Sequence, residues 1–137
     1  MATNAIEKTL SKNDTGETGG HQAGICVPKS PEILGFFPQL EAKIKNPRVP
    51  LDIIDDAGRD WTFVFIYYNN RFFGGTRNDY RLTGMTAFFR EFNLKAGDKV
   101  FLHRESPHVI RITFKRAGKQ QGVLKLSTTW KVIDAEC

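Results

Sequence analysis

The sequence predicts a mainly β domain, folded as a β-barrel or a related open barrel, with two small helices. Three observations predict this. Short strand-like segments follow one another along most of the 137 residues, turns that contain glycine or proline separate them, and strands and helices do not alternate as in a parallel sheet. A chain of this length fits one domain with its own buried core. We therefore expect residues 1–137 to form a single domain.

The first 22 residues predict a strand followed by a long surface loop. Residues 1–10 have Ile6 and Leu10 as large apolar positions and predict one strand after a few frayed residues. Residues 11–22 contain three glycines and no large hydrophobic side chain, so they are unsuited to a core. A loop this long in a compact domain is more often functional than accidental, with a mobile linker as the plain alternative.

Two segments predict short helices. Ser30 is a suitable N-cap residue and Pro31 suits the first helical position, so residues 31–36 predict one helix. In the second segment, apolar residues recur at i, i+3, i+4 and i+7, which places them on one helical stripe. They are Met85, Phe88, Phe89 and Phe92. Ordinary core packing is the expected role of these aromatic side chains.

The best-supported strand prediction is Trp61–Tyr68. Both of its alternating faces are apolar, which is typical of a strand covered on both sides. In residues 109–116 apolar and polar residues alternate, so one face is expected to point inward. The remaining predicted strands are residues 23–27, 51–54, 99–105, 123–126 and 128–133, and residues 39–50 predict a polar connection.

A turn loosened by glycines, Gly74–Arg81, follows the strongest strand and leads into a short strand. Its side chains are of the types that read DNA base edges. Arg77 and Arg81 can each offer a guanine two donors in a fork, Asp79 can accept from a cytosine amine, and Tyr80 can press on a thymine methyl group. The segment therefore predicts a DNA-reading loop. A solvated ion pair between Asp79 and an arginine is the plain alternative.

The charge distribution favours a polyanionic partner. Residues 71–131 hold 13 Lys and Arg against 4 Asp and Glu, a net +9, whereas the rest of the chain holds 7 against 11, a net −4. The basic excess therefore accompanies the candidate loop. Neutralised phosphates release counterions, which makes such binding depend on salt. The alternative is a cationic face that only aids solubility.

Catalytic and metal-binding alternatives find little support. Glu41-Ala42-Lys43 has the E-x-K form of a nuclease metal site, with Asp14 as a possible second carboxylate, but its flanks do not predict the strand that such a site needs. His103 and His108 lack a third ligand at a suitable spacing. We therefore predict no enzymatic activity in the domain itself, no metal and no cofactor.

A different class of function is a single-stranded nucleic-acid module on an OB-like barrel. Phe72, Phe73 and Tyr80 could stack bases over a basic groove. Such a module would prefer single strands with loose sequence dependence, whereas a loop that reads the major groove requires a duplex. This preference separates the two hypotheses.

Cysteine usage and hydropathy predict a soluble intracellular protein. The two cysteines, Cys26 and Cys137, suit a reducing cytoplasm better than a disulfide framework. Apolar runs are too short to span a membrane, and the N-terminus lacks a signal pattern. We expect no membrane partner.

Two sets of motifs carry a resemblance to known families. The run Gly84–Phe101, with its turn Leu94-Lys95-Ala96-Gly97-Asp98, resembles the helix, LxxGD turn and strand of the plant B-three DNA-binding domain, a pseudobarrel. The segments Leu10–Gly24, Tyr67–Asn70 and Gly74–Asn78 resemble the N-terminal effector domain of EcoRII-type restriction endonucleases. The resemblance covers nearly the whole chain, and its motifs are long and ordered.

The resemblance implies a seven-stranded open pseudobarrel with two short α-helices and two arms that grip double-stranded DNA from the major groove. The N-terminal arm would lie near residues 12–22 and the second arm at residues 75–81. The base-reading residues that the resemblance implies are Arg77, Asp79, Arg81 and His21, and side-chain chemistry adds Tyr80 and Gln22. The predicted backbone contacts or arm supports are Lys12, Asn13, Thr18, Gly20, Thr76, Asn78 and Arg71.

The resemblance also implies a site and a context. A short duplex of the CC…GG kind would be the target, although Gly75 and Tyr80 stand where the EcoRII domain carries lysines. The domain would be the targeting part of a longer type II restriction endonuclease of the prokaryotic cytoplasm, with a nuclease domain in the same longer chain.

Overall fold

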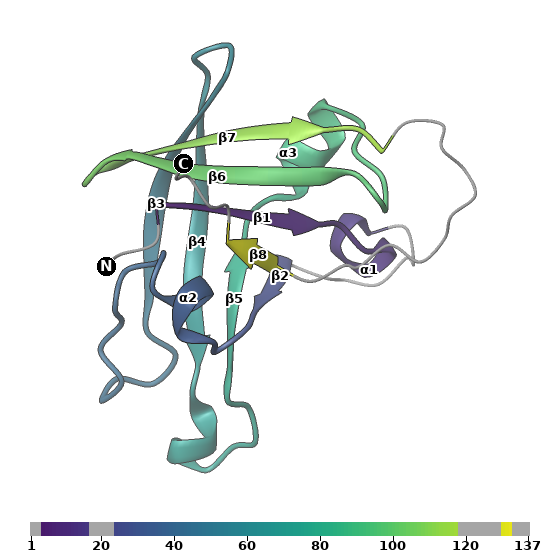
Figure 1. The fold of residues 1–137 in the computed structure, drawn as a ribbon. Coiled ribbons are helices and arrows are strands. Elements are labelled where there is room, and N and C mark those ends of the chain that lie inside the picture. Colours follow the sequence, from purple (N-terminus) through teal and green to yellow (C-terminus); the bar gives the residue numbers. More distant parts are fainter. Residues whose placement is uncertain (1–3, 17–23, 118–129, 133–137) are drawn as a thin grey trace.

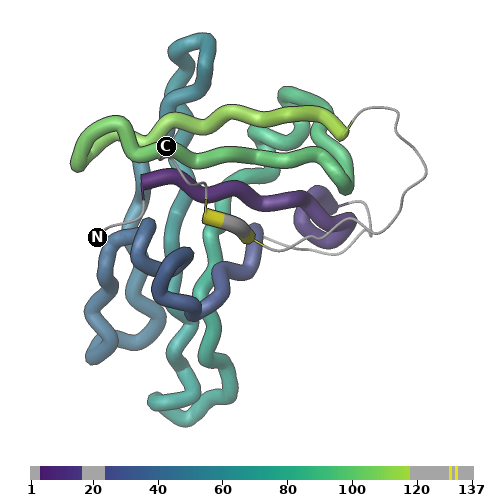
Figure 2. The backbone as a smooth tube through the Cα atoms, in the orientation of Figure 1, coloured from purple at the N-terminus to yellow at the C-terminus, as the bar shows by residue number. Residues whose placement is uncertain are grey.

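The computed structural model describes residues 4–16, 24–117 and 130–132, which form one strongly curled sheet with short helices around it (Figure 1). Figure 2 shows the same path as a backbone tube. The strands are β1 (Ala5–Thr9), β2 (Gly24–Val27), β3 (Arg48–Asp55), β4 (Asp60–Tyr68), β5 (Asp79–Thr83), β6 (Lys99–Ser106), β7 (Val109–Lys115) and β8 (Trp130–Val132). The helices are α1 (Lys12–Thr15), α2 (Pro31–Leu34), the 3₁₀ turn η1 (Asn70–Phe73) and α3 (Thr86–Glu91).

The strand order is β2-β5-β4-β3-β7-β6-β1-β8. Neighbouring strands are antiparallel except for β3 and β7, which are parallel. In Figure 1, β1, β6 and β7 run across β3, β4 and β5, so the sheet turns back on itself. The two strands at the ends of this order, β2 and β8, are linked by one hydrogen bond. The Trp130 indole Nε1 of β8 donates it to the Cys26 carbonyl of β2 at 2.9 Å. The predicted mainly β open pseudobarrel is confirmed, with eight strands in the described part of the chain where seven were expected.

The core lies inside the curl of the sheet and is rich in aromatic rings. The largest fully buried side chains include Phe36, Phe63, Phe65 and Phe88. The predicted helical stripe is confirmed: Met85 and Phe88 are fully buried, and Phe88 packs edge-on against Trp61 with ring centroids 5.2 Å apart. These contacts hold α3 against one end of the sheet (Figure 1).

Strand β4 has one covered face and one largely uncovered face. Phe63 and Phe65 point inward and are fully buried. On the opposite face Thr62 is exposed, Val64 and Tyr68 are half-buried, and only Ile66 is buried. The expectation that both faces are covered therefore fails on the outer face at Thr62 and Val64 and holds at Ile66. The uncovered face continues onto β5, where the candidate site lies.

The hairpin turn between β3 and β4 is closed by Asp55, which is 3% exposed. Its carboxylate accepts hydrogen bonds from the backbone amides of Ala57 and Arg59, at 2.9 and 3.0 Å, and from the Trp61 indole at 2.9 Å. Burial on its own raises the pKa of the Asp55 carboxyl, but these hydrogen bonds lower it by more, so the net pKa lies below the ordinary 3.8. Hydrogen bonds from within the turn thus stabilise the buried Asp55 carboxylate.

Other boundaries differ from the predictions for local reasons. Strand β3 begins at Arg48, within the predicted polar connection, because residues 48–50 pair with β4. Helix α2 ends two residues earlier than predicted. Helix α1 replaces part of the predicted loop, because Ser11 and Asp14 form a reciprocal capping box: Ser11 Oγ accepts from the Asp14 amide at 3.1 Å, and Asp14 accepts from the Ser11 amide at 2.9 Å.

Several predictions fall on residues that the structure does not describe. They are the strand at 123–126 and the central part of the N-terminal arm, with Thr18, Gly20, His21 and Gln22. Among the described residues, none of the helices combines the length and hydropathy that crossing a membrane requires.

Candidate nucleic-acid interface

The second arm (residues 75–81) grows out of the β4–β5 ladder. The last register pair of this ladder is Tyr68 with Asp79. Beyond it, η1 and Gly74, which has a left-handed backbone conformation (φ 92°), reverse the direction of the chain. We call residues 70–74 the arm tip. The Asn70 side chain accepts from the Arg77 amide at 2.7 Å, and the Asn70 carbonyl accepts from the Gly75 amide at 2.7 Å. A Cβ at residue 75 would lie 2.6 Å from Asn70 Oδ1, so a larger residue there would require this tied side chain to move.

The base of the arm is fixed to a neighbouring loop by Asn69, which is fully buried. Its Oδ1 accepts from the Asn46 amide at 2.6 Å, and its Nδ2 donates to the carbonyls of Ala42 and Ile44 at 3.1 and 2.9 Å. Buried polar groups are costly unless they are paired in this way. The arm therefore starts from a rigid base.

Two arginines hold one aspartate on the outer face of β5. Nε and Nη2 of Arg77 donate to the two carboxylate oxygens of Asp79 at 3.1 and 2.9 Å, and Nε of Arg81 donates to Asp79 Oδ2 at 3.2 Å. The three side chains are 44%, 29% and 30% exposed in the order Arg77, Asp79, Arg81. Burial raises the pKa of the Asp79 carboxyl, but the hydrogen bonds from Arg77 and Arg81 lower it by more. Asp79 is therefore an ionised acceptor at neutral pH.

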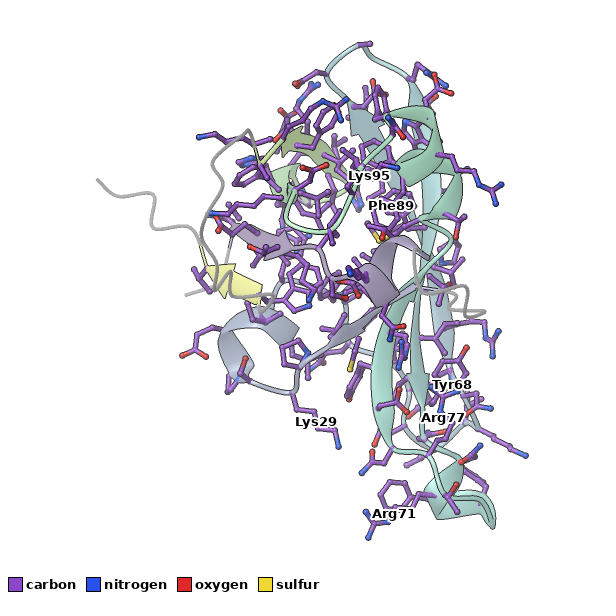
Figure 3. The ribbon with its side chains drawn as sticks, turned by 90° about the vertical axis from the view of Figure 1, so that its right-hand side faces the viewer. Lys29, Tyr68, Arg71, Arg77, Phe89 and Lys95 are labelled. Atoms are coloured by element: carbon purple, nitrogen blue, oxygen red, sulfur yellow. The ribbon has the colours of Figure 1, made fainter. Side chains whose placement is uncertain are left out.

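The guanidinium group of Arg77 also rests on an aromatic ring. Its central carbon lies 3.9 Å from the centroid of the Tyr68 ring (Figure 3). Tyr68 and Asp79 are register partners and so share this outer face. Stacking and the bidentate ion pair together fix the plane of the guanidinium, which reduces the conformational entropy lost when it binds a partner.

Tyr80 points to the opposite, inner face, where it is half-buried. Its ring stacks on Tyr67, at 4.2 Å between centroids, and on Phe65, at 5.7 Å. Burial raises the pKa of the Tyr80 hydroxyl, and Tyr67 raises it further. The Tyr67 hydroxyl donates to Asn78 Oδ1 at 2.6 Å. Tyr80 therefore lies on the opposite face of β5 from Asp79 and Arg81, because successive side chains of a strand point to opposite faces, and its base contact stays a prediction.

The other predicted site residues lie on separate elements. Arg71 and Thr76 are exposed on the arm tip and the second arm, and Asn78 is half-buried. Lys12 and Asn13 are exposed on α1, which begins the predicted N-terminal arm. Sequence reasoning missed the supporting roles of Tyr68 and Asn69.

Sequence reasoning also missed Cys26, which is exposed on β2 and is the register partner of Arg81 on the outer face. Strand alternation offered a signal for it, since Ile25 and Val27 on either side are buried. Cys26 therefore extends the outer face of β4 and β5 across to β2.

The alternative site residues do not gather into a catalytic or metal centre. Asp14 is engaged by the Ser11 amide and by Lys8 Nζ, at 2.9 and 3.3 Å. Glu41 accepts from the Lys43 amide at 3.3 Å and lies in a turn rather than on a strand. Within the described ranges, His, Cys, Asp and Glu form no group of three or more that could hold a metal ion.

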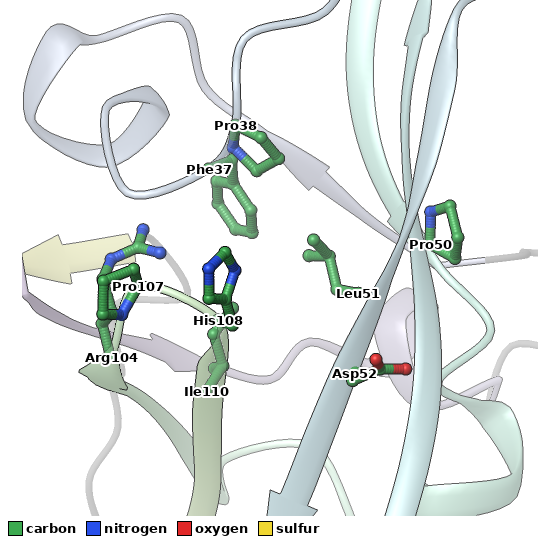
Figure 4. Close-up of a pocket in the computed structure, with 9 residues that line it drawn as sticks. All are labelled: Phe37, Pro38, Pro50, Leu51, Asp52, Arg104, Pro107, His108 and Ile110. Atoms are coloured by element: carbon green, nitrogen blue, oxygen red, sulfur yellow. The ribbon is translucent and has the colours of Figure 1, made fainter.

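A pocket of about 290 Å³ lies away from the second arm. It is lined by residues that follow α2, by residues of β3, and by residues in and beside the β6–β7 turn (Figure 4). Its lining consists of Phe37, Pro38, Pro50, Leu51, Asp52, Arg104, Pro107, His108 and Ile110. None of the arm residues contributes to this lining. We assign the pocket no part in the interface.

The sequence and the fold are similar to those of several known proteins. The family described as restriction endonuclease EcoRII, N-terminal, matches residues 2–98. The type II restriction enzyme EcoRII of Escherichia coli is 43% identical over 84 residues, 56% of this chain and 19% of the enzyme. The B3 domain-containing transcription repressor VAL1 of Arabidopsis thaliana is 35% identical over 102 residues, 74% of this chain and 11% of the repressor. The chain therefore spans about a fifth or less of these relatives.

Two solved structures share the fold. One is FUS3 in the Arabidopsis FUS3–DNA complex, with a TM-score of 0.63 and 22% identity over 82% of this chain and 96% of that chain. The other is a hypothetical Arabidopsis thaliana protein, with a TM-score of 0.52 and 15% identity over 86% of this chain and 97% of that chain.

Proposed function

Because the chain belongs to the family of EcoRII N-terminal restriction endonuclease domains, we propose that it binds double-stranded DNA sequence-specifically, with the second arm in the major groove. The observation that carries this proposal is the placement of Asp79 between Arg77 and Arg81 on a half-exposed outer face. Relatives whose names or titles refer to restriction, transcription or DNA support the same class of partner.

The hydrogen bonds within the arm leave donors for a base. An arginine has five N–H donors. Arg77 uses its Nε–Nη2 edge on Asp79, so the edge formed by Nη1 and Nη2 can point toward O6 and N7 of a guanine. Arg81 uses only Nε, at the same carboxylate. Each arginine can therefore read a guanine while Asp79 keeps it oriented, and Asp79 itself can accept from the paired cytosine.

The N-terminal arm, near residues 12–22, is the second gripping element in this proposal, with His21 and Gln22 at bases. Its support is the anchorage of the strand that follows it. Gly24 pairs with Thr83 of β5, and a Cβ at residue 24 would lie only 2.0 Å from the Leu82 carbonyl oxygen. The chain thus leaves the first arm in close contact with the strand that ends the second arm.

A competition experiment tests the duplex proposal. A labelled duplex with a CC…GG core is competed, at fixed salt, by the same duplex, by a scrambled duplex and by its separated single strands. We expect the core duplex to compete best, and Arg77→Ala to weaken its binding by about 1–3 kcal/mol. Arg59→Ala is the matched control, since Arg59 is 49% exposed and lies at the opposite end of β4.

Each outcome of this competition distinguishes a class of function. Equal loss of binding in Arg77→Ala and Arg59→Ala would contradict readout by the arm and leave only general attraction to phosphates. A preference for the single strands would support the OB-like alternative instead.

We also propose that the chain is the non-catalytic targeting part of a longer restriction endonuclease, whose nuclease domain lies elsewhere in that protein. The 19% share of the EcoRII enzyme that the match covers supports this proposal. Incubation of the purified domain with Mg²⁺ and a core duplex should leave the DNA intact. Cleavage that is lost in Glu41→Ala would show instead that the E-x-K segment is catalytic.

A further inference from the structure

The arm tip exposes two phenylalanines side by side in the sequence. Phe72 is 65% exposed and Phe73 is 43% exposed. The described residues contain five exposed large apolar side chains, of which Phe72 and Phe73 are two. Another of the five, Ile44, lies on the loop that Asn69 ties to the base of the arm. Exposed apolar groups that gather at one place mark interaction sites more often than scattered ones do.

Backbone hydrogen bonds hold the turn that carries these two rings. The Phe72 amide donates to the Asn69 carbonyl at 3.0 Å, and the Arg71 amide donates to the Arg77 carbonyl at 2.9 Å. Asn69 itself is fully buried at the base of the arm. The two rings therefore project from a fixed turn rather than from a loose loop, which lowers the entropy lost when they contact a partner.

We propose that Phe72 and Phe73 form an apolar tip that contacts base edges and thymine methyl groups in the base pairs flanking the recognition site. This inference rests on the proposed duplex binding. Arg77, Asp79 and Arg81 lie on or next to β5, whereas Phe72 and Phe73 belong to η1, at the turn where the arm ends. With the arginines over the core of the site, the tip reaches beyond it along the groove.

The surroundings of the tip favour DNA over another copy of this protein. Arg71 is exposed within the same turn, and the partly exposed guanidinium groups of Arg77 and Arg81 lie in the adjoining second arm. Figure 3 labels Arg71 at the tip and Arg77 higher up the arm. A self-association surface would bring these like charges together, whereas a duplex supplies phosphates for the cations and methyl groups for the rings. A phenyl ring against a thymine methyl is an established form of major-groove contact.

The test compares flanks at a constant core. Duplexes with the same CC…GG core carry either thymine-rich flanks or the same flanks with deoxyuridine in place of thymidine. Wild-type protein, the double variant Phe72→Ser with Phe73→Ser, and the conservative double variant Phe72→Leu with Phe73→Leu are titrated against each duplex. Val109→Ser is the matched control, since Val109 is an exposed apolar residue of β7.

We expect wild type to bind the thymine-flanked duplex about threefold to tenfold more tightly than the deoxyuridine-flanked duplex. The serine variant should lose this preference and keep its affinity for the deoxyuridine-flanked duplex, while the leucine variant keeps part of the preference and Val109→Ser keeps all of it. Thermal unfolding checks that the serine variant is folded.

Three results would overturn the inference. One is an equal affinity of wild type for the thymine-flanked and deoxyuridine-flanked duplexes, and another is an equal loss by the serine variant on both duplexes. The third is a wild-type dimer in sedimentation that the serine variant converts to a monomer, since the rings would then serve self-association. Failure of the proposed function itself differs from all of these, because wild type would then show no preference for the core duplex over the scrambled duplex in the competition experiment.

Discussion

The two hairpins that β4 forms, with β3 at one end and with β5 at the other, each place an aspartate where the ladder ends. Asp55 is 3% exposed, and its donors are two backbone amides and an indole of its own turn. Asp79 is 29% exposed, and its donors are the side chains of Arg77 and Arg81. Each backbone amide has one N–H and gives it to Asp55, whereas the guanidinium groups of Arg77 and Arg81 bind Asp79 and still keep N–H donors for another acceptor. The same residue type therefore serves folding at one end of β4 and, we propose, recognition at the other.

The largest expected effect is on folding, at the β3–β4 turn. Asp55→Ala leaves the Trp61 indole and two amides without their acceptor, so we expect the free energy of unfolding to fall by about 3 kcal/mol. Urea unfolding followed by tryptophan fluorescence measures this. Asp56→Ala, at the exposed neighbouring residue, should cost less than about 0.5 kcal/mol. A similar loss in both variants would mean that the buried carboxylate has no special part in the fold.

The second prediction concerns the other aspartate. Asp79→Asn should change the free energy of unfolding by less than about 1 kcal/mol, because half-exposed ion pairs contribute little. The preference for a core duplex over a scrambled one should fall by about 1–3 kcal/mol, because the arginines lose their orientation and cytosine loses its acceptor. Competition binding measures the ratio. An unchanged ratio would reduce Asp79 to a surface ion pair and break the contrast with Asp55.

The third prediction concerns the inner side of the arm. Tyr67→Phe keeps the stack on Tyr80 but removes the hydrogen bond to Asn78. We expect DNA affinity to fall by about 0.5–1.5 kcal/mol, with specificity retained, because the arm is less well ordered while its arginines are intact. Tyr80→Phe is the control that keeps the ring stack. Fluorescence anisotropy with a core duplex would measure both variants, and an equal response of the two would argue against a role for the Asn78 contact.

The smallest expected effect is on the pH dependence of stability. The folded-state pKa of Asp55 lies below 3.8, so its contribution to stability is fully present above that pH and is lost as the pH falls through the folded-state value. The difference in unfolding free energy between wild type and Asp55→Asn should thus be constant near neutrality and shrink below pH 3.8. Urea titrations at several pH values measure it. A gap that widens in acid would reverse the assigned sign.

Much of the fold was predictable because its local signals agree with its packing. The apolar run of β4 and the stripe of α3 are such signals, and both are confirmed. The predicted coverage of both faces of β4 failed at Thr62 and Val64, since hydropathy reports what a face could bury and not what lies over it. Helix α1 was missed because it has no apolar face, although its capping box, Ser11 with Asp14, is a recognisable sequence signature.

The candidate site was predictable at the level of residue type and less so at the level of geometry. Arg77, Asp79 and Arg81 do meet, whereas Tyr80 between Asp79 and Arg81 necessarily points away from them in an extended strand. Applying the two-residue period to the loop would have separated Tyr80 from its neighbours. The role of Asn69 depends on carbonyls more than twenty residues away, which leave no local pattern.

The position of β1 in the sheet has a consequence for the time course of synthesis. Strand β1 pairs with β6 and β8, so roughly ninety residues, from Thr9 to Lys99, must follow it before its first partner exists. At about 5–20 residues per second this delay on the ribosome is about 5–20 seconds. During that interval the arm hairpin β4–β5 can already form, since its strands are close in sequence. The segment proposed to read DNA would then take shape before the first strand of the sheet has found its partner.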